Sequence, residues 1–283
     1  MENLRSTYRL NNSVQIPKMG FGTWQLSDGD EAYNAVLSAI RAGYRHIDTA
    51  AMYGNEKSVG AAIKDSGVDR ESLFITSKLP NSAHGYLPAR EAFIESLKNL
   101  GLQYLDMYLI HWPNPMRNRS NWKQANRDSW KALEELFYNG KIRAIGVSNF
   151  RAHHLDALFE SAVVIPAVNQ IRLCPGDEDT KTVRYCRDQN ILLEAYSPLG
   201  SGLALEVPLI QQLAKAYKKS PSQICLRWSL QNGYLPLPKT TSPERMAENA
   251  DVFDFELVGP DMLDIAELKD CSGHAGDPDK VEW

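Results

Sequence analysis

Leu73-Phe74-Ile75-Thr76-Ser77-Lys78 is a short apolar segment that ends in a lysine, and its composition is typical of a buried β-strand. Two other segments share this pattern, Tyr44-Arg45-His46-Ile47-Asp48 and Tyr108-Leu109-Ile110-His111, and Tyr53 lies in the loop after Asp48. In a closed barrel of parallel strands, the C-terminal strand ends and the loops after them form the functional face. A carboxylate, a phenol, an amine and an imidazole would therefore meet there, which predicts a proton-donor assembly built around a tyrosine.

Strand-like and helix-like stretches alternate along nearly the whole chain. Before the alternation, Tyr8-Arg9-Leu10 and Val14-Gln15-Ile16 flank Asn11-Asn12-Ser13, which predicts a β-hairpin. The absence of a composition break, and of a GxGxxG motif after the first strand, favours a closed parallel barrel over a doubly wound sheet. We therefore predict one α/β domain over residues 1–283, a (β/α)8 TIM barrel with an N-terminal β-hairpin.

The expected elements of the barrel follow from the apolar spacing. The expected strands are 19–22, 44–48, 73–78, 105–110, 142–147, 167–170, 191–196 and 234–238. The expected helices are 31–41, 56–64, 91–100, one carrying Trp130, Leu133 and Phe137, 152–161, 182–187, 210–218, 222–231 and a final helix from Pro243.

Composition narrows the class of protein. The chain is 43% hydrophobic and 23% charged, which is typical of a globular protein with a substantial core. A net charge of −4 without a Lys/Arg run argues against nucleic acid as a partner. The four cysteines are scattered without a CxxC pair, which favours reduced thiols. With no apolar leader or membrane-length segment in the sequence, we expect a cytoplasmic protein that does not bind membranes.

The chemistry of the four strand-end residues is specific when they are taken together. A free phenol has a pKa near ~10, too high for efficient proton donation at neutral pH. A Lys78 ammonium beside Tyr53 would lower that pKa, and Asp48 would keep the ammonium charged. His111 would orient a carbonyl oxygen. Each residue alone has an ordinary explanation, as a turn cap, a pocket wall, a surface charge or a core histidine, but their joint placement favours the functional one.

Motifs spread over the chain carry a family resemblance. They are Gly20-Phe21-Gly22-Thr23-Trp24, Ile47-Asp48-Thr49-Ala50-Ala51-Met52-Tyr53-Gly54-Asn55-Glu56, Thr76-Ser77-Lys78-Leu79, Leu109-Ile110-His111-Trp112-Pro113, Ile145-Gly146-Val147-Ser148-Asn149-Phe150, Ala195-Tyr196-Ser197-Pro198-Leu199-Gly200, Pro238-Lys239 and Pro243-Glu244-Arg245-Met246-Ala247-Glu248-Asn249. In this order they resemble the aldo-keto reductases from the first hairpin to the last helix. The short loop over 114–122 and the brief C-terminal tail resemble compact bacterial members such as the 2,5-diketo-D-gluconate reductases.

The resemblance implies NADPH-dependent reduction of small aldehydes, dicarbonyls or keto-sugars to alcohols. Tyr53 would be the general acid, assisted by Lys78 and Asp48, and His111 would direct the carbonyl. Relatives that reduce a carbon–carbon double bond carry Glu at the position of His111, so carbonyl chemistry is favoured. Members of the family often work as monomers, and we expect a monomer here.

The resemblance also implies a nicotinamide site. Ser148, Asn149 and Gln170 would bind the carboxamide, and the ring of Tyr196 would stack on the nicotinamide. The loop over the pyrophosphate would contain Ser197, Leu199 and Ser201. In isolation, Ser148-Asn149 would be read as a simple turn after a strand, and the loop as a flexible segment.

The adenosine-phosphate site would lie near the C-terminus. It would be formed by Lys239, Thr240, Ser242, Arg245, Glu248 and Asn249. Ser242 followed by Pro243 predicts a helix N-cap and first helical position, and a helix N-terminus beside two cations suits a phosphate. This arrangement favours NADPH over NADH. An exposed, charged helix start is the alternative explanation, so the phosphate assignment depends on the family match.

Trp24, Tyr53, His111 and Trp112 are the predicted substrate-binding residues, together with Met52. Core packing is the alternative for the two tryptophans and the methionine. The polar side chains of the 114–122 loop, Asn114, Arg117, Arg119 and Trp122, are looser candidates for a polar or carboxylated substrate, and surface polarity explains them equally well.

The chain departs from the family pattern after Gln170, where relatives commonly have Glu, an apolar residue, His and Pro. Here Arg172 reverses the charge and Cys174 removes the imidazole. The change could alter cofactor binding or place a cation near an acidic substrate, and we favour local repacking. Pro80 replaces an aromatic pocket wall of many relatives, which suggests a wider mouth.

Two other classes of function are weighed against the reductase. A nucleotide-sensing module would bind NADPH tightly with little turnover, and the intact set of four residues argues against it. A metal-dependent hydrolase would need clustered His and Asp ligands, which the six histidines do not suggest. His153-His154 opens an expected helix and is assigned to a solvated face. We therefore predict no metal site.

Overall fold

Eight parallel strands form a barrel in the computed structural model, which describes residues 2–282. The strands, in spatial as well as chain order, are β3 (Phe21–Gly22), β4 (His46–Asp48), β5 (Phe74–Leu79), β6 (Leu105–Ile110), β7 (Ile142–Ser148), β8 (Val168–Arg172), β9 (Leu192–Tyr196) and β10 (Leu235–Leu237). The predicted (β/α)8 barrel is therefore confirmed.

The seam between the first and last strands closes through backbone hydrogen bonds. Gly20 N–H donates to the Pro236 carbonyl (3.1 Å), and Gly22 N–H donates to the Pro238 carbonyl (3.0 Å). A Cβ on Gly20 would lie 2.5 Å from Leu237 Cδ2 and 2.7 Å from His46 Nδ1. Only glycine fits at this crowded position, because a side chain there would collide with the interior of the barrel.

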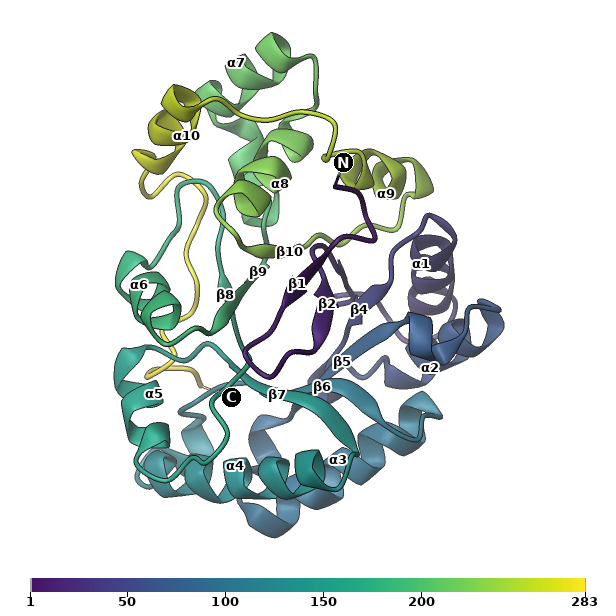
Figure 1. Cartoon of the computed structure of the whole chain (residues 1–283), viewed down its shortest axis with the longest axis vertical. Coiled ribbons are helices and arrows are strands. Elements are labelled where there is room, and N and C mark those ends of the chain that lie inside the picture. The colour runs from purple at the N-terminus through teal and green to yellow at the C-terminus, as the bar shows by residue number, and fades with distance from the viewer. Residues whose placement is uncertain (1, 283) are drawn as a thin grey trace.

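Ten α-helices surround the strands in the described part of the chain (Figure 1). They are α1 (Asp30–Arg41), α2 (Glu56–Asp65), α3 (Tyr86–Leu100), α4 (Trp122–Tyr138), α5 (Ala152–Phe159), α6 (Thr180–Asp188), α7 (Pro208–Tyr217), α8 (Pro221–Gln231), α9 (Pro243–Ala250) and α10 (Gly259–Ala266). The sequence predicted each of these except α10, although α3 begins five residues earlier than the expected 91–100. Within residues 2–282 no helix is both long and apolar enough to cross a membrane.

The predicted N-terminal hairpin is also confirmed, with β1 (Thr7–Arg9) pairing antiparallel with β2 (Gln15–Pro17). It lies across one end of the barrel, in front of the strands in Figure 1. Its buried side chains Leu10 and Ile16 share an apolar cluster with side chains from the barrel strands, among them Phe74, Met107, Val168 and Leu235. Full burial of such a side chain contributes about 1.5–3 kcal/mol, so the hairpin seals this end with apolar contacts.

Side chains alternate between the barrel interior and the surrounding helices, because neighbouring residues of a strand point to opposite faces. On β9, Leu193 and Ala195 belong to the core between strands and helices, whereas Leu192 belongs to the apolar cluster at the sealed end. Glu194 and Tyr196 therefore follow Leu192 up the interior face of the barrel. The same alternation brings the polar ends of the other strands to the open mouth.

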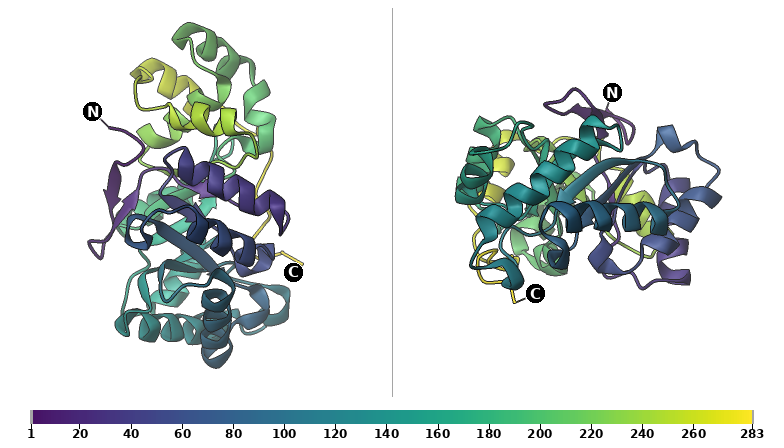
Figure 2. Two further views of the ribbon diagram at one scale, coloured as in Figure 1. Left: turned by 90° about the vertical axis from the view of Figure 1, so that its right-hand side faces the viewer. Right: turned by 90° about the horizontal axis from the view of Figure 1, so that it is seen from below.

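The segment after α10 runs back across the open end of the barrel, so the C-terminus lies on the opposite side of the molecule from the hairpin (Figure 2). Arg151 Nη1 binds Asp277 Oδ1 (2.8 Å), and Asn114 Nδ2 donates to Asp279 Oδ1 (3.1 Å). Residues 268–282, called the C-terminal tail below, therefore cover part of the mouth.

Candidate active site

Three of the four predicted catalytic residues, Asp48, Tyr53 and Lys78, meet at the mouth of the barrel. Lys78 Nζ lies 2.6 Å from Asp48 Oδ1, 2.9 Å from the Thr49 carbonyl oxygen and 3.4 Å from the Tyr53 hydroxyl. Lys78 is completely buried and Asp48 is 3% exposed. A buried ammonium needs such partners, because leaving it unpaired in an apolar interior is very costly.

The loop that carries Tyr53 is held by a buried asparagine. Tyr53 ends the short 3-10 helix η1 (Ala51–Tyr53), which follows β4. Asn55 Nδ2 donates to the carbonyl oxygens of Thr23 and Leu26 (both 3.0 Å), and its Oδ1 accepts from Thr49 Oγ1 (2.8 Å). These bonds tie the Tyr53 loop to the loop after β3, so the phenol is positioned before any substrate arrives.

The electrostatics of the group correct one expectation. Burial raises the pKa of the Tyr53 phenol, and the Lys78 ammonium only partly offsets that rise, so the predicted net lowering is wrong. Burial alone would lower the pKa of Lys78, but the charges and hydrogen bonds of Asp48 and Tyr53 together outweigh burial, and the pKa is raised. At neutral pH the phenol therefore keeps its proton beside a charged ammonium.

His111 follows β6 and is buried beside the phenol. Its ring meets the Tyr53 ring edge-on, with 5.7 Å between ring centroids. Burial and the nearby Lys78 charge hold the pKa of His111 well below its usual value. The imidazole is therefore neutral near pH 7 and can donate one hydrogen bond without carrying a charge.

Ser148, Asn149 and Tyr196 meet beside this group. Asn149 Nδ2 donates to the His111 carbonyl oxygen and to Ser148 Oγ (both 3.1 Å), and its Oδ1 accepts from the Tyr196 hydroxyl (2.9 Å). Asn149 has a left-handed backbone (φ 62°), which asparagine tolerates better than most residues. One amide therefore links the ends of β6, β7 and β9.

Gln170 is also brought to the site, and it is held from two sides. Its Nε2 donates to Asp48 Oδ2 (2.8 Å) and to Glu194 Oε2 (2.7 Å). An amide nitrogen has two hydrogens, so both are used. The Gln170 backbone carbonyl accepts from Ser148 Oγ (2.8 Å) and from Asn149 N–H (3.0 Å). Among residues 2–282, the hydrogen bonds of the Gln170 side chain are those donated by its Nε2.

Glu194 and His46 were not singled out from the sequence, yet both lie inside the barrel beneath the site. Both side chains are completely buried, and Glu194 Oε1 lies 3.9 Å from His46 Nε2. His46 Nε2 lies 3.0 Å from Thr76 Oγ1. The available signal was a charged residue within the apolar run 191–195, two residues before Tyr196 and so on the same strand face.

The predicted pyrophosphate loop leaves β9 with an unusual backbone. Ser197 (φ 48°) and Ser201 (φ 56°) both adopt left-handed conformations, and Leu199 lies between them. Ser201 belongs to the segment η5 (Gly200–Glu206), which contains non-helical angles. The loop is thus irregular where the sequence predicts close approach to a ligand.

The predicted adenosine-phosphate residues gather around the start of α9. Ser242 is the N-cap, and its Oγ accepts from Arg245 N–H (3.2 Å), while Thr240 Oγ1 accepts from Ser242 N–H (3.1 Å). Lys239 and Arg245 are exposed. Of the other two residues, Asn249 is buried, and Glu248 binds the Ser220 hydroxyl of the neighbouring helix α8.

The predicted substrate residues line the mouth rather than the core. Trp24 is 51% exposed and Met52 is 42% exposed, which excludes core packing for both. A cavity of about 260 Å³ is lined by Met52, Asn81, Ser82, Pro115 and Arg117. Met52 precedes Tyr53 in η1, so this cavity adjoins the loop that carries the phenol.

Trp112 is half-buried and lies next to the C-terminal tail. A Cβ on Gly276 would be 3.7 Å from Trp112 Cη2. Arg119, a looser candidate, donates a hydrogen bond to the Val281 carbonyl oxygen. The tail therefore lies beside the predicted substrate-binding residue Trp112.

The departure from the family pattern at Arg172 also involves the tail. Arg172 Nε donates to Asp177 Oδ2 (2.6 Å), and its Nη2 donates to the Ser272 carbonyl oxygen. Cys174 is completely buried, and burial raises its pKa to about 11. These contacts support local packing, because Arg172 is committed to the tail and to the loop after β8.

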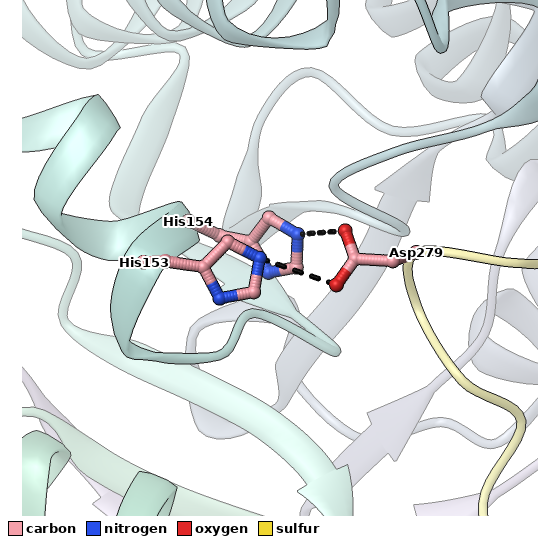
Figure 3. A group of neighbouring side chains, drawn as sticks. All are labelled: His153, His154 and Asp279. Carbon is pink, nitrogen blue, oxygen red and sulfur yellow. Dashed lines mark hydrogen bonds and ion pairs between the residues drawn. The ribbon is translucent and has the colours of Figure 1, made fainter.

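His153, His154 and Asp279 form a cluster that the sequence did not predict (Figure 3). Asp279 Oδ1 lies 2.9 Å from His154 Nε2, and Asp279 Oδ2 lies 3.2 Å from His153 Nε2. His153 is exposed, but the His154 side chain is completely buried, so the assignment of the pair to a solvated face is wrong for His154. The expectation that the histidines do not cluster with acids is also wrong.

Hydrogen bonding identifies this cluster as an anchor for the tail. His154 Nδ1 accepts from the Arg151 backbone N–H (3.1 Å), and burial lowers the pKa of His154 to about 4. The single ring proton therefore lies on Nε2 and is donated to Asp279. A metal at that nitrogen would have to displace this proton, so the geometry favours a carboxylate anchor over a metal site.

Comparison with known proteins agrees with the geometry. The family model described as Aldo/keto reductase family matches residues 18–270. The glyoxal reductase of Bacillus subtilis is 46% identical over 278 residues, which cover 98% of each chain. Among solved structures, MGS-M4, an aldo-keto reductase from a deep-sea metagenome library, superposes with a TM-score of 0.92 at 42% identity, covering 98% of this chain and 100% of that one.

A more distant solved structure carries a cofactor. The Bombyx mori aldo-keto reductase, crystallised in complex with NADP, has a TM-score of 0.86 at 34% identity, covering 95% of this chain and 94% of that one. The family match spans most of the chain, and these relatives are matched over nearly their full lengths. The chain therefore belongs to the aldo/keto reductase family.

Proposed function

We propose that this aldo-keto reductase uses NADPH to reduce small aldehydes, dicarbonyls and keto-sugars to alcohols, with Tyr53 as the general acid. The observation that carries the proposal is the buried contact of Lys78 with both Asp48 and the Tyr53 hydroxyl. The similarity to a glyoxal reductase supports a small dicarbonyl as substrate.

Tyr53 would protonate the carbonyl oxygen as the alcohol forms. Because burial raises the pKa of the phenol, the proton is present at neutral pH. When the proton leaves, the negative charge develops 3.4 Å from Lys78 Nζ. The ammonium therefore stabilises the product state of the acid more than its starting state, which is the requirement for lowering a barrier.

His111 would orient the carbonyl group. Its low pKa keeps the imidazole neutral, so it can donate a hydrogen bond to the substrate oxygen without competing as an acid. The bond from Asn149 Nδ2 to the His111 carbonyl oxygen fixes the strand end behind the ring. Tyr53 and His111 would thus approach the same substrate oxygen from two sides.

The residues beside Tyr196 fit a nicotinamide. NADPH, when bound, supplies the hydride for the reduction. Gln170 would accept from the carboxamide NH₂, since its own NH₂ is held by Asp48 and Glu194. Ser148 and Asn149 would complete the carboxamide contacts, and the Tyr196 ring would support one face of the nicotinamide. Ser197, Leu199 and Ser201 would cover the pyrophosphate.

The start of α9 fits the adenosine phosphate. The exposed Lys239 and Arg245 flank a helix N-terminus capped by Ser242, a favourable position for a dianion. Thr240 lies in the same turn, and Glu248 and Asn249, further along the helix, would contact the adenine. Trp24, Met52 and Trp112 would line the substrate cavity above Tyr53 and His111.

The test is the loss of NADPH absorbance with a panel of aldehydes, dicarbonyls and keto-sugars, run in parallel with NADH. We expect turnover with NADPH that exceeds turnover with NADH, and the best rates with small dicarbonyls. Tight NADPH binding without turnover on any carbonyl would contradict the proposal and favour a nucleotide-sensing protein.

A further inference from the structure

Glu194 is a buried acid that has no role in the proposed reaction. It lies on the interior face of β9, one side-chain layer below Tyr196, and its side chain is completely buried. Carboxylates are almost never fully buried unless a partner compensates them. The partner here is neither a cation nor a metal but the amide of Gln170.

The contact orients that amide. Gln170 Nε2 lies 2.7 Å from Glu194 Oε2 and 2.8 Å from Asp48 Oδ2. Asp48 accepts at Oδ2, and Glu194 accepts at Oε2 whether it is ionised or carries a proton on Oε1. The NH₂ group must therefore lie between these two oxygens, and the side-chain carbonyl oxygen must point away. Asp48 alone could hold one hydrogen, but the amide could then swing about that bond. The second contact, from Glu194, stops this rotation.

The nearest charged groups, Asp48 and Lys78, act on Glu194 in opposite directions. On β4 and β5, the Asp48 carboxylate and the Lys78 ammonium form a close pair (2.6 Å). Burial and the Asp48 charge raise the pKa of Glu194 to about 8, against a weaker lowering by the Gln170 hydrogen bond and the Lys78 charge. The carboxyl is therefore protonated at neutral pH and becomes a net negative charge only in mildly alkaline solution.

The other groups around Glu194 do not neutralise that charge. His46 on β4 is 3.9 Å away, and burial lowers its pKa to about 3, so it stays uncharged. Arg172, at the end of β8, is already paired with Asp177. The neighbouring strand β10 presents leucines to the interior. Within the described residues, Glu194 Oε1 accepts and donates no hydrogen bond.

We propose that Glu194 is a positioning residue that aims the Gln170 carbonyl oxygen at the cofactor carboxamide, and that its ionisation shifts the site from reduced toward oxidised cofactor. The inference rests on the proposed NADPH site. The oxidised nicotinamide ring carries a positive charge and the reduced ring is neutral. A carboxylate beneath the ring therefore favours the oxidised form, and a neutral carboxyl does not.

The experiment measures dissociation constants of NADP⁺ and NADPH by quenching of tryptophan fluorescence between pH 6 and 9.5. The ratio of the two constants removes pH effects common to both forms, such as ionisation of the phosphate near pH ~6. The variants are Glu194→Gln, a neutral isostere, and Glu194→Leu, which removes the acceptor. The matched control is Glu56→Gln, because Glu56 is a buried carboxyl that bonds Ser77 outside the barrel.

In the wild type, the NADP⁺/NADPH ratio of dissociation constants should fall on the order of tenfold between pH 7 and 9.5. In Glu194→Gln it should stay at the wild-type pH 7 value throughout, while Glu56→Gln follows the wild type. Glu194→Leu should weaken both forms about tenfold at every pH, because Gln170 loses one anchor.

Two results would overturn the inference. The first is a NADP⁺/NADPH ratio of dissociation constants in Glu194→Gln that changes with pH as it does in the wild type. The second is wild-type affinity for both cofactor forms in a folded Glu194→Leu protein. Glu194→Gln keeps the test decisive even if the leucine variant fails to fold. A wild-type protein that binds neither cofactor form would instead refute the proposed function on which the inference rests.

Discussion

The Tyr53 hydroxyl is the group on which the proposed chemistry converges. Burial raises the pKa of this hydroxyl. The hydroxyl lies 3.4 Å from the Lys78 ammonium, which Asp48 keeps charged. With this combination the phenol is protonated at neutral pH, and the ammonium stabilises the phenolate that forms when the proton is transferred. The reactive state is therefore set by three side chains from two neighbouring strands and the loop between them.

Replacing Tyr53 with Phe removes the hydroxyl and keeps the ring. We expect turnover to fall at least about 100-fold, the usual contribution of a positioned general acid, while NADPH binds with near wild-type affinity. The measurements are steady-state kcat and a fluorescence titration with NADPH. Tyr138→Phe is the control, since Tyr138 is 65% exposed at the end of α4. Near wild-type reduction by the Tyr53 variant would refute the mechanism.

The C-terminal tail is an element held by side chains far from it in sequence. Asp279 receives hydrogen bonds from Asn114 and His154, and Arg151 binds Asp277. The tail thus joins the loop after β6 to the start of α5. Its contact near Trp112 places it beside a proposed substrate-binding residue, where its order would affect substrate more than cofactor.

Asp279→Ala should release this anchor. The buried His154 N–H and Asn114 amide would lose their acceptor, at a cost of about 1–3 kcal/mol in the free energy of unfolding. We expect faster proteolytic cleavage within 268–282 and a raised KM for the carbonyl with little change in kcat. Asp264→Ala, at an exposed position on α10, is the matched control. Cleavage and KM equal to wild type in both variants would show that the anchor does not order the tail.

At the scale of the whole molecule, the buried Glu194 makes stability depend on pH. Its pKa is raised from 4.5 to about 8, so the folded protein keeps a proton that the unfolded chain releases. The stabilising contribution of this proton is fully present below pH 4.5 and is lost as the pH rises to about 8. The free energy of unfolding should therefore decline across this window.

Glu194→Gln should remove that decline. Thermal unfolding at intervals from pH 5 to 8.5 should give a Tm that falls less with pH in the variant than in the wild type, with Glu56→Gln resembling the wild type. The comparison of slopes cancels any constant change caused by the substitution. Equal slopes for Glu194→Gln and the wild type would mean that Glu194 ionises in the folded protein as it does in water.

The barrel and the four strand-end residues could be predicted because their signals are local. Each apolar strand ends next to its functional side chain, and parallel strands bring those ends to one face. Asp279 meets His154 across 125 residues, and no local pattern indicates that contact. The burial of Glu194 and the resulting pKa shifts depend on several strands at once. The sequence did not predict the net rise in the pKa of Tyr53 for the same reason, because the effect of burial on that pKa outweighs the effect of the Lys78 charge.

The hairpin and the tail lie at opposite ends of the same barrel (Figure 2). The hairpin end is sealed by Leu10 and Ile16, whereas the opposite end carries the proposed active site. For protein engineering the two ends are therefore not equivalent. A purification tag or immobilisation linker joined near residue 2 would extend from the sealed base and leave the mouth open to solution. The same attachment after residue 282 would hang beside the entrance and compete with whatever passes through it.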